Sequence, residues 1–285
     1  MGFIWGIPYL LIRVAVEDLT PATIIFGRLA IASLILIPIA MHRKTLLPAL
    51  KGIKYIALYS VIEIVGPQFL ITNAERSITS GLTGLLIATV PIWSTIFTSM
   101  HGDKTVWHHK RLIGLVIGFI GVMSLVGLES ISGRSPFWAI GSVLLAAVGY
   151  AYAVIMIRIK LPDVSSIAIN AVAIAMAALF YAPFTIAQWP EGGLQSISAK
   201  SIWAIVGLGV ICTAVAFIVF FEVMKEIGPA RTSLITYLNT AIAVLLGVLI
   251  LNEPLTIGIA IGLPLVLIGS YFASRKPRDT RTNLK

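Results

Sequence analysis

The chain has 285 residues, of which 58% are apolar and only 12% are charged, and its formal net charge is +9. A soluble domain carries about 25% charged residues, so this chain has too few polar side chains to cover the surface of a water-soluble globule. The same apolar content excludes an intrinsically disordered chain, which depends on low hydrophobicity.

Ten apolar stretches follow one another along the chain, each close to the roughly 20 residues that a helix needs to cross a bilayer. The predicted membrane helices cover residues 1–17, 22–41, 53–73, 80–100, 111–127, 136–158, 164–186, 201–222, 229–251 and 256–273. The sequence therefore predicts an all-α membrane protein with ten transmembrane helices.

Lys and Arg are concentrated in every second loop and in the basic tail, residues 275–285. The loops on the other side hold Arg13, Arg76, Arg134 and Lys200. Because cytoplasmic loops carry the excess of Lys and Arg, this asymmetry predicts that both termini lie in the cytoplasm. The net positive charge then serves orientation among membrane lipids, and we expect no nucleic-acid partner.

An internal repeat links the two halves of the chain. The stretch TSGLTGLLIATVPIWSTIFTSMHGDKT and the stretch GPARTSLITYLNTAIAVLLGVLILNEPLT are each followed by a glycine-containing helix, and the copies lie about 150 residues apart. Asp103 then matches Glu253, and Gly114 matches Gly262. Since five helices separate the copies, the second copy enters the membrane upside down, which predicts two inverted five-helix repeats.

Two further features are the stretch WGIPYLLIRVAVEDLTP at the start and the motif from Tyr237 to Thr256. Together with the repeat, they resemble the drug/metabolite transporter superfamily, specifically bacterial ten-helix transporters with two EamA domains. The resemblance implies a first repeat at residues 1–130 and a second at 131–274. It also implies alternating access around a central cavity, with the fifth and tenth helices at the periphery, and an exporter of amino acids, similar metabolites or drugs. It implies a place in the cell (inner) membrane, and no cofactor. Where the family commonly has Glu-Pro in the ninth helix, this chain has Asn239-Thr240, which removes a carboxylate and a kink.

Arg28 and Glu63 are the two charged residues well inside predicted spans. A charge in hydrocarbon costs at least about 2.5 kcal/mol, so both should face the bundle interior. Two interpretations remain open. In the first, Arg28 binds an anionic group of a substrate and Glu63 binds a proton or a cationic group. In the second, the two residues form an ion pair that joins the second and third helices. At the rim, Arg13 and Glu17 are spaced for a local i,i+4 pair, with a cavity-lining role for Arg13 as the alternative.

Further candidates for substrate binding are polar or aromatic residues inside spans, or residues at an expected kink. Thr236 and Asn239 share one face of the ninth helix, Tyr237 lies on the adjacent stripe, and such a polar face is expected against protein or water. Interhelical hydrogen bonding and ordinary packing are the alternatives for these residues. The remaining candidates are Trp5, Tyr9, Gln68, Pro91 and Tyr150.

Two glycine pairs at i,i+4 spacing predict close helix packing in the fifth and tenth helices. They are Gly114 with Gly118 and Gly258 with Gly262. The four histidines fall in predicted cytoplasmic loops, so we expect no metal site.

Two other classes of protein compete with a transporter. A membrane-embedded lipid-modifying enzyme would need catalytic side chains gathered at one depth, but the predicted spans contain no His or Asp. A channel more often uses rings of repeated subunits. We therefore expect a carrier of a small molecule and not an enzyme. The carrier would be driven by protons through Glu63, or it would work by facilitated diffusion.

Overall fold

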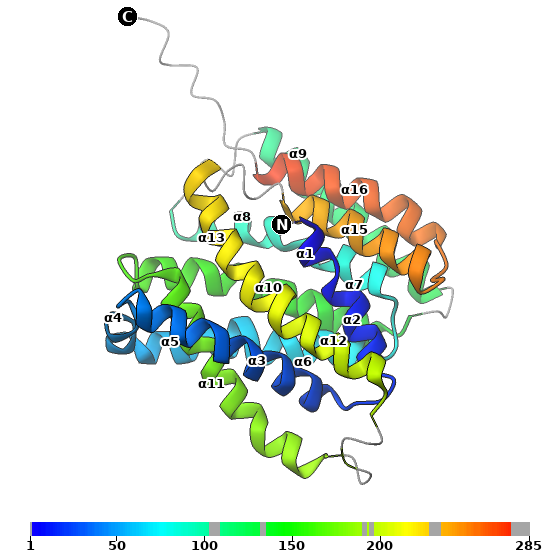
Figure 1. The fold of residues 1–285 in the computed structure, drawn as a ribbon. Helices are drawn as coiled ribbons and strands as arrows, with labels where there is room; N and C mark the ends of the chain where they lie inside the picture. The colour runs from blue at the N-terminus through cyan, green and yellow to red at the C-terminus, as the bar shows by residue number, and fades with distance from the viewer. Residues whose placement is uncertain are drawn as a thin grey trace, which may run out of the picture.

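The structure is a computed structural model that describes residues 2–102, 109–131, 135–189, 193, 197–227 and 235–274. The side chains of residues 109–111, 125–131, 221, 224, 225, 227, 235–238 and 273–274 lie outside this description. So do the basic tail and Asp103. Every regular element of the described residues is helical (Figure 1).

The first half of the chain forms five apolar spans. They consist, in chain order, of α1 (Gly2–Gly6) with α2 (Pro8–Ala15), α3 (Pro21–His42), α5 (Ile53–Tyr59) with η1 (Ser60–Val65) and α6 (Gly66–Ala74), α7 (Ser80–Ile87) with α8 (Val90–Met100), and α9 (His109–Ile131). A short helix, α4 (Leu46–Lys51), precedes the third span.

The second half repeats this plan. Its spans are α10 (Phe137–Lys160), α11 (Ser166–Ala187), α12 (Ala199–Gly209) with η4 (Val210–Val215) and α13 (Ala216–Ile227), α15 (Ile235–Ile250), and α16 (Ile257–Ser274). Within the described residues, these elements follow the predicted ranges in order.

The chain is an all-α membrane protein with an internal repeat. Within the described residues, six helices are long and apolar enough to cross a membrane, and four shorter apolar helices accompany them. Large apolar side chains cover their outer faces; Leu34 is 76% exposed and Ile186 is 78% exposed. Soluble proteins rarely expose so many, whereas hydrocarbon solvates them.

The first and fourth spans are broken next to prolines. Pro8 begins α2 after a break at Ile7, and Pro91 lies in the first turn of α8 after a break at Ala88–Thr89. Proline has no backbone N–H and its ring clashes with the preceding turn, so a helix ends or bends there.

Equivalent spans of the two halves run antiparallel. At the start of α7, Ser80 meets Glu253, which follows α15, and deeper in the bundle Thr240 meets Gly84. The second and seventh spans do the same, since the Thr185 hydroxyl near the end of α11 donates to the Ala22 carbonyl at the start of α3 (3.2 Å). Two copies of one unit that meet antiparallel are inverted relative to each other, as the odd spacing of the repeat predicted.

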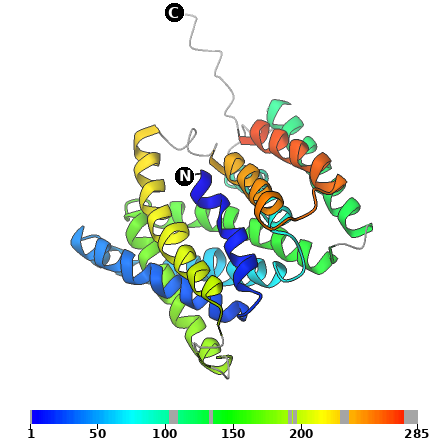
Figure 2. The same ribbon diagram turned by 45° about the vertical axis from the view of Figure 1, so that its right-hand side comes forward.

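The fifth and tenth spans form one edge of the bundle, where α16 runs beside α9 (Figures 1 and 2). The N-terminal helix α1 lies instead between α13 and α15 (Figure 2). The first and ninth spans are therefore interior, and the fifth and tenth spans are peripheral.

Candidate functional site

A polar cluster inside the bundle is centred on Arg28 of α3. Its Nε donates to the Thr213 hydroxyl in η4 (2.8 Å), and its Nη1 donates to the Gln68 side-chain oxygen in α6 (2.9 Å). Thr213 belongs to the second half of the chain, whereas Arg28 and Gln68 belong to the first. One guanidinium thus joins the second, third and eighth spans across the two halves.

The ion pair between Arg28 and Glu63 is not formed, so that interpretation was wrong. Arg28 bonds to two neutral side chains, and the Glu63 oxygen Oε2 is buried without a hydrogen-bond partner among the described residues. The side chains lie on the same two helices as expected, but the helices are rotated so that Gln68 faces the guanidinium instead.

Two tyrosines complete the cluster. The Gln68 amide nitrogen donates to the Tyr150 hydroxyl of α10 (3.5 Å), and Tyr150 lies within electrostatic range of Glu63, Tyr9 and Arg28. The sixth span fits closely against the third because residue 149 is glycine. A Cβ there would lie 2.8 Å from the Ile62 carbonyl oxygen, inside van der Waals contact. The first, second, third, sixth and eighth spans therefore converge on this cluster.

The third and eighth spans each contain one π-helical turn, which is wider than an α-helical turn. The two turns occupy equivalent places in the repeat. The turn η1 covers Ser60–Val65 and the turn η4 covers Val210–Val215. Glu63 and Thr213 are the fourth residues of these turns. Such turns disrupt the normal α-helical hydrogen-bond ladder and often mark functional sites. The repeat therefore places a carboxyl and a hydroxyl in matching positions, and the hydroxyl is the one that contacts Arg28.

The ninth span is tied to the first and fourth. The Thr240 hydroxyl donates to the Gly84 carbonyl (3.3 Å), and a Cβ on Gly6 would lie 3.0 Å from the Asn239 carbonyl oxygen. The Tyr9 ring lies beside Gly84 as well, which connects this contact to the polar cluster. The side chains of Thr236 and Tyr237, the other two predicted residues of this span, lie outside the described part.

Two other candidates lie apart from Arg28. The Trp5 ring packs against Phe220 (4.7 Å between ring centroids) and Phe217 (6.3 Å) of α13. Pro91 lies in the first turn of α8, and its carbonyl accepts a hydrogen bond from the Thr95 hydroxyl (2.8 Å). Trp5 thus takes part in packing between the first and eighth spans, and Pro91 belongs to the break in the fourth.

Glycines allow α9 and α16 to touch. A Cβ on Gly269 would collide with the Gly118 backbone and lie 2.8 Å from the Gly114 carbonyl oxygen. Gly258 and Gly262 are buried on α16. Gly269 thus lies against Gly118 and Gly114 where the two helices approach closely, and it was not a member of the predicted glycine pairs.

A second polar group closes one end of the bundle. Glu253 accepts hydrogen bonds from the backbone N–H of Ser80 (2.9 Å), the Ser80 hydroxyl (2.9 Å) and the backbone N–H of Gly81 (3.2 Å). A carboxylate at a helix start satisfies free N–H groups and the helix dipole. Glu253 therefore ties the end of the ninth span to the start of the fourth.

Arg13 lies near this end but does not pair with Glu17, so that expectation was wrong. Its Nη1 donates to the backbone carbonyl of Glu75 (2.8 Å). The Glu75 side chain is fully buried, and neither carboxylate oxygen has a hydrogen-bond partner among the described residues. Arg13 thus joins the first span to the end of the third.

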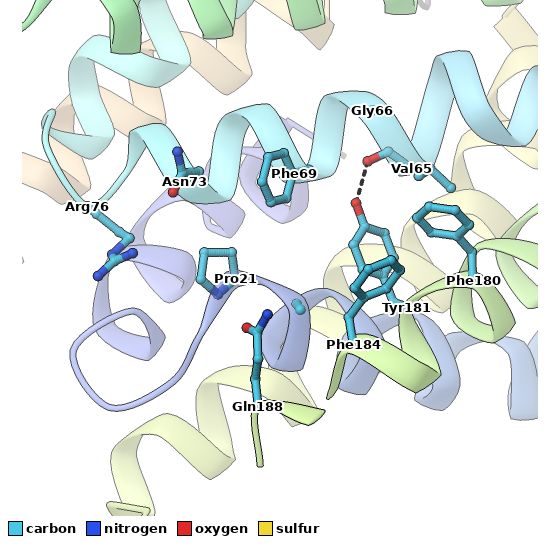
Figure 3. Close-up of a pocket in the computed structure, with 11 residues that line it drawn as sticks. Pro21, Val65, Gly66, Phe69, Asn73, Arg76, Phe180, Tyr181, Phe184 and Gln188 are labelled. Carbon is cyan, nitrogen blue, oxygen red and sulfur yellow. Dashed lines mark hydrogen bonds between the residues drawn. The ribbon is translucent and has the colours of Figure 1, made fainter. Parts of the chain in front are cut away.

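Two cavities flank the third span, and Arg28 lines neither. One, of about 490 Å³, lies between α3, α6 and α11 (Figure 3). The other, of about 330 Å³, lies between the third span, α8 and α10 and is lined by residues that include Pro67, Phe97 and Tyr152. Among the described residues, no group of three His, Cys, Asp or Glu side chains could hold a metal ion.

Sequence reasoning missed Thr213, although a signal for it was present. Thr213 lies 150 residues after Glu63, the same separation as between Asp103 and Glu253. Extending the repeat from the loops to the spans would have marked it as the counterpart of a candidate residue.

Taken together, the apolar exterior, the inverted halves and a polar cluster shared between them define a multi-pass membrane protein of the transporter class. The model of the EamA-like transporter family matches residues 1–127 and 137–275, and the chain belongs to this family.

Curated relatives are similar along almost their whole length. An uncharacterized inner membrane transporter, YedA of Escherichia coli (strain K12), is 26% identical over 284 residues, which are 96% of this chain and 90% of that protein. An uncharacterized transporter, YoaV of Bacillus subtilis (strain 168), is 24% identical over 277 residues, 94% of this chain and 92% of that protein. A crystal structure of a protein with 18% sequence identity has a TM-score of 0.65 over 95% of this chain and 96% of its own, which shows a shared fold.

Proposed function

We propose that this transporter exports a small polar or amphipathic metabolite across the inner membrane by alternating access and binds it at the cluster around Arg28. The observation that carries the proposal is the pair of bonds from Arg28 to Gln68 and to Thr213. A site made by both halves of an inverted repeat changes shape when one half rocks against the other.

The chemistry of the cluster favours a ligand with an anionic group. Gln68 and Thr213 are neutral, so they leave the charge of Arg28 uncompensated. A guanidinium has five N–H donors, and the two bonds leave others for a carboxylate, which Arg binds in a bidentate manner. Glu63, whose Oε2 has no partner among the described residues, would take a proton or the ammonium group of the same ligand. Amino acids and their analogues combine these two groups.

The transport pathway would open and close where the fourth and ninth spans meet at each side of the membrane. The bonds from Ser80 and Gly81 to Glu253 hold one end together, and the distribution of Lys and Arg assigns this end to the outer side of the membrane. Asp103, the repeat counterpart of Glu253, would take the same part at the cytoplasmic end. Both termini would then be cytoplasmic, and the repeats would cover residues 1–130 and 131–274.

Comparison of metabolites in medium and cells, with and without the protein, identifies the substrate. Uptake of that compound into inverted vesicles then tests the site. We expect Arg28→Gln to reduce uptake at least tenfold, because a charge-assisted hydrogen bond contributes about 1.5–3 kcal/mol. Arg43→Gln is the matched control, since Arg43 is a surface residue paired with Glu222 (3.4 Å). Full uptake by Arg28→Gln would place the site elsewhere.

Coupling is tested in the same vesicles. If Glu63 carries the proton, Glu63→Gln abolishes the dependence of uptake on a pH gradient, and an unchanged dependence contradicts that role. A wild type that ignores the gradient indicates facilitated diffusion. We propose no enzymatic activity, because the relatives are named as transporters.

A further inference from the structure

The cavity of about 490 Å³ opens beside the third span, away from the Arg28 cluster, where three helix ends meet. α3 begins there at Pro21, α6 ends there at Ala74 and α11 ends there at Ala187. Figure 3 shows side chains from all three helices around it.

The two ends of this groove differ in chemistry. Its deeper part is aromatic, with Phe69, Phe180 and Phe184 exposed by 47%, 50% and 46%. Its mouth carries Asn73, Arg76 and Gln188 instead (Figure 3). A groove with an apolar interior and a cationic, amide-lined mouth matches an amphiphile with a negative head.

Arg76 carries the positive charge at the mouth of the groove. Among the described residues, no hydrogen bond or ion pair engages the Arg76 guanidinium or the Asn73 side-chain amide. Arg76 is exposed and follows the end of α6. The ends of a helix that crosses the bilayer lie at the level of the lipid headgroups. A cation there attracts an anionic headgroup by about 1 kcal/mol.

The length of the groove matches one leaflet. Its lining runs along the third span from Val65 and Gly66 to Arg76, which is about 15 Å at 1.5 Å per helical residue. The hydrocarbon core of a bilayer is about 30 Å thick, so the groove reaches from the headgroup level to about the midplane. At its floor the Tyr181 hydroxyl donates to the Val65 carbonyl (2.6 Å). Because these two polar groups bond to each other, an acyl chain can lie beside them without breaking a hydrogen bond.

We propose that this groove binds one phospholipid with an anionic headgroup, taken from the leaflet that borders this end of the bundle. The headgroup phosphate contacts Arg76, with the amides of Asn73 and Gln188 as further donors, and an acyl chain lies against Phe69, Phe180 and Phe184. The site joins α3, α6 and α11 on the face turned to the membrane. It does not depend on which metabolite is carried.

Native mass spectrometry of the full-length protein tests this site, with phosphatidylglycerol and phosphatidylcholine added in equal amounts to the delipidated sample. We expect the wild type to retain one phosphatidylglycerol in preference to phosphatidylcholine. Arg76→Gln should reduce this preference about fivefold, the equivalent of about 1 kcal/mol, and Arg76→Lys should keep most of it. Lys200→Gln is the matched control, because Lys200 is exposed near the start of α12 at the same end and does not line the groove.

A second measurement locates the lipid. Trp189 follows the groove residue Gln188, so brominated phosphatidylglycerol should quench its fluorescence more than brominated phosphatidylcholine does, and Trp189→Phe identifies its share of the signal. Arg76→Gln should remove the difference. A wild type without preference for phosphatidylglycerol would overturn the proposal, and so would equal losses in Arg76→Gln and Lys200→Gln, which would indicate general surface attraction.

Discussion

Glu253, beyond the end of α15, binds Ser80 in the first turn of α7 through both its carboxylate oxygens. Oε1 accepts from the Ser80 backbone N–H and Oε2 from its hydroxyl, each at 2.9 Å. The Glu253 side chain lies against Gly247 in the last turns of α15. A Cβ at residue 247 would collide with the Glu253 oxygen Oε2. The contact between the fourth and ninth spans therefore depends on a missing side chain as well as on a present one.

Glu253→Ala should destabilise the folded protein by about 1–3 kcal/mol, because it leaves the N–H groups of Ser80 and Gly81 without their acceptor. Thermal unfolding in detergent measures the loss. Gly247→Ala should have a similar effect by displacing the carboxylate, and the double variant should lose little more than either single one. Additive losses would show that the two residues act independently.

Gly269→Ala should weaken the contact between α9 and α16, because its methyl group would overlap the Gly118 backbone. Overpacking of this kind costs about 1–3 kcal/mol. Gly141→Ala in α10 is the control, since a Cβ there meets nothing within 4 Å and alanine is the better helix former. Equal melting temperatures for the two variants would contradict this account of the helix contact.

Thr213→Val should impair transport while the protein still reaches the membrane. The Thr213 hydroxyl accepts from Arg28 and donates to the Leu208 carbonyl (2.8 Å), so valine leaves the Arg28 Nε without its acceptor. We expect uptake into vesicles to fall about tenfold or more, and Thr213→Ser to restore most of it. If valine and serine variants transport alike, the hydroxyl does not position Arg28.

Acid should weaken the contact between the loop after the first span and the start of the eighth. Asp18 accepts hydrogen bonds from the Ser198 hydroxyl and from the Ser201 hydroxyl (2.7 Å). These bonds, chiefly that of Ser198, lower the pKa of Asp18 below its usual value. A lowered pKa in the folded state gives stability that is present above the unfolded pKa of about 3.9 and is lost as the pH falls through the folded value.

Asp18→Asn should therefore lower the melting temperature at neutral pH and remove part of its decline below about pH 4. Melting curves at several pH values compare the variant with the wild type, with Asp163→Asn as a control for an exposed acid elsewhere. Parallel curves for Asp18→Asn and the wild type would show that Asp18 does not contribute to the acid dependence.

The contact between Arg28 and Gln68 shows why the partner of a buried charge was beyond sequence reasoning. Both residues were predicted to lie inside spans, but the ion-pair interpretation gave Glu63 as the partner of Arg28, because these two are the charged residues well inside the spans. The wide turn η1 changes the helical phase between Glu63 and Gln68, and each residue of an α-helix turns the face by about 100°. A pattern of apolar residues does not reveal such a turn, so the face presented to Arg28 was not predictable.

The sequence by itself determined the membrane spans, their order and the repeat, because crossing a bilayer requires about 20 apolar residues in a row and that requirement is local. It also determined the family, which the matches over residues 1–127 and 137–275 confirm. Only the tertiary structure decided that Arg28 binds Thr213, that Arg13 binds the Glu75 carbonyl and that Gly269 meets Gly118. These contacts join residues far apart in the chain, and they depend on how each helix is rotated and shifted against its neighbours.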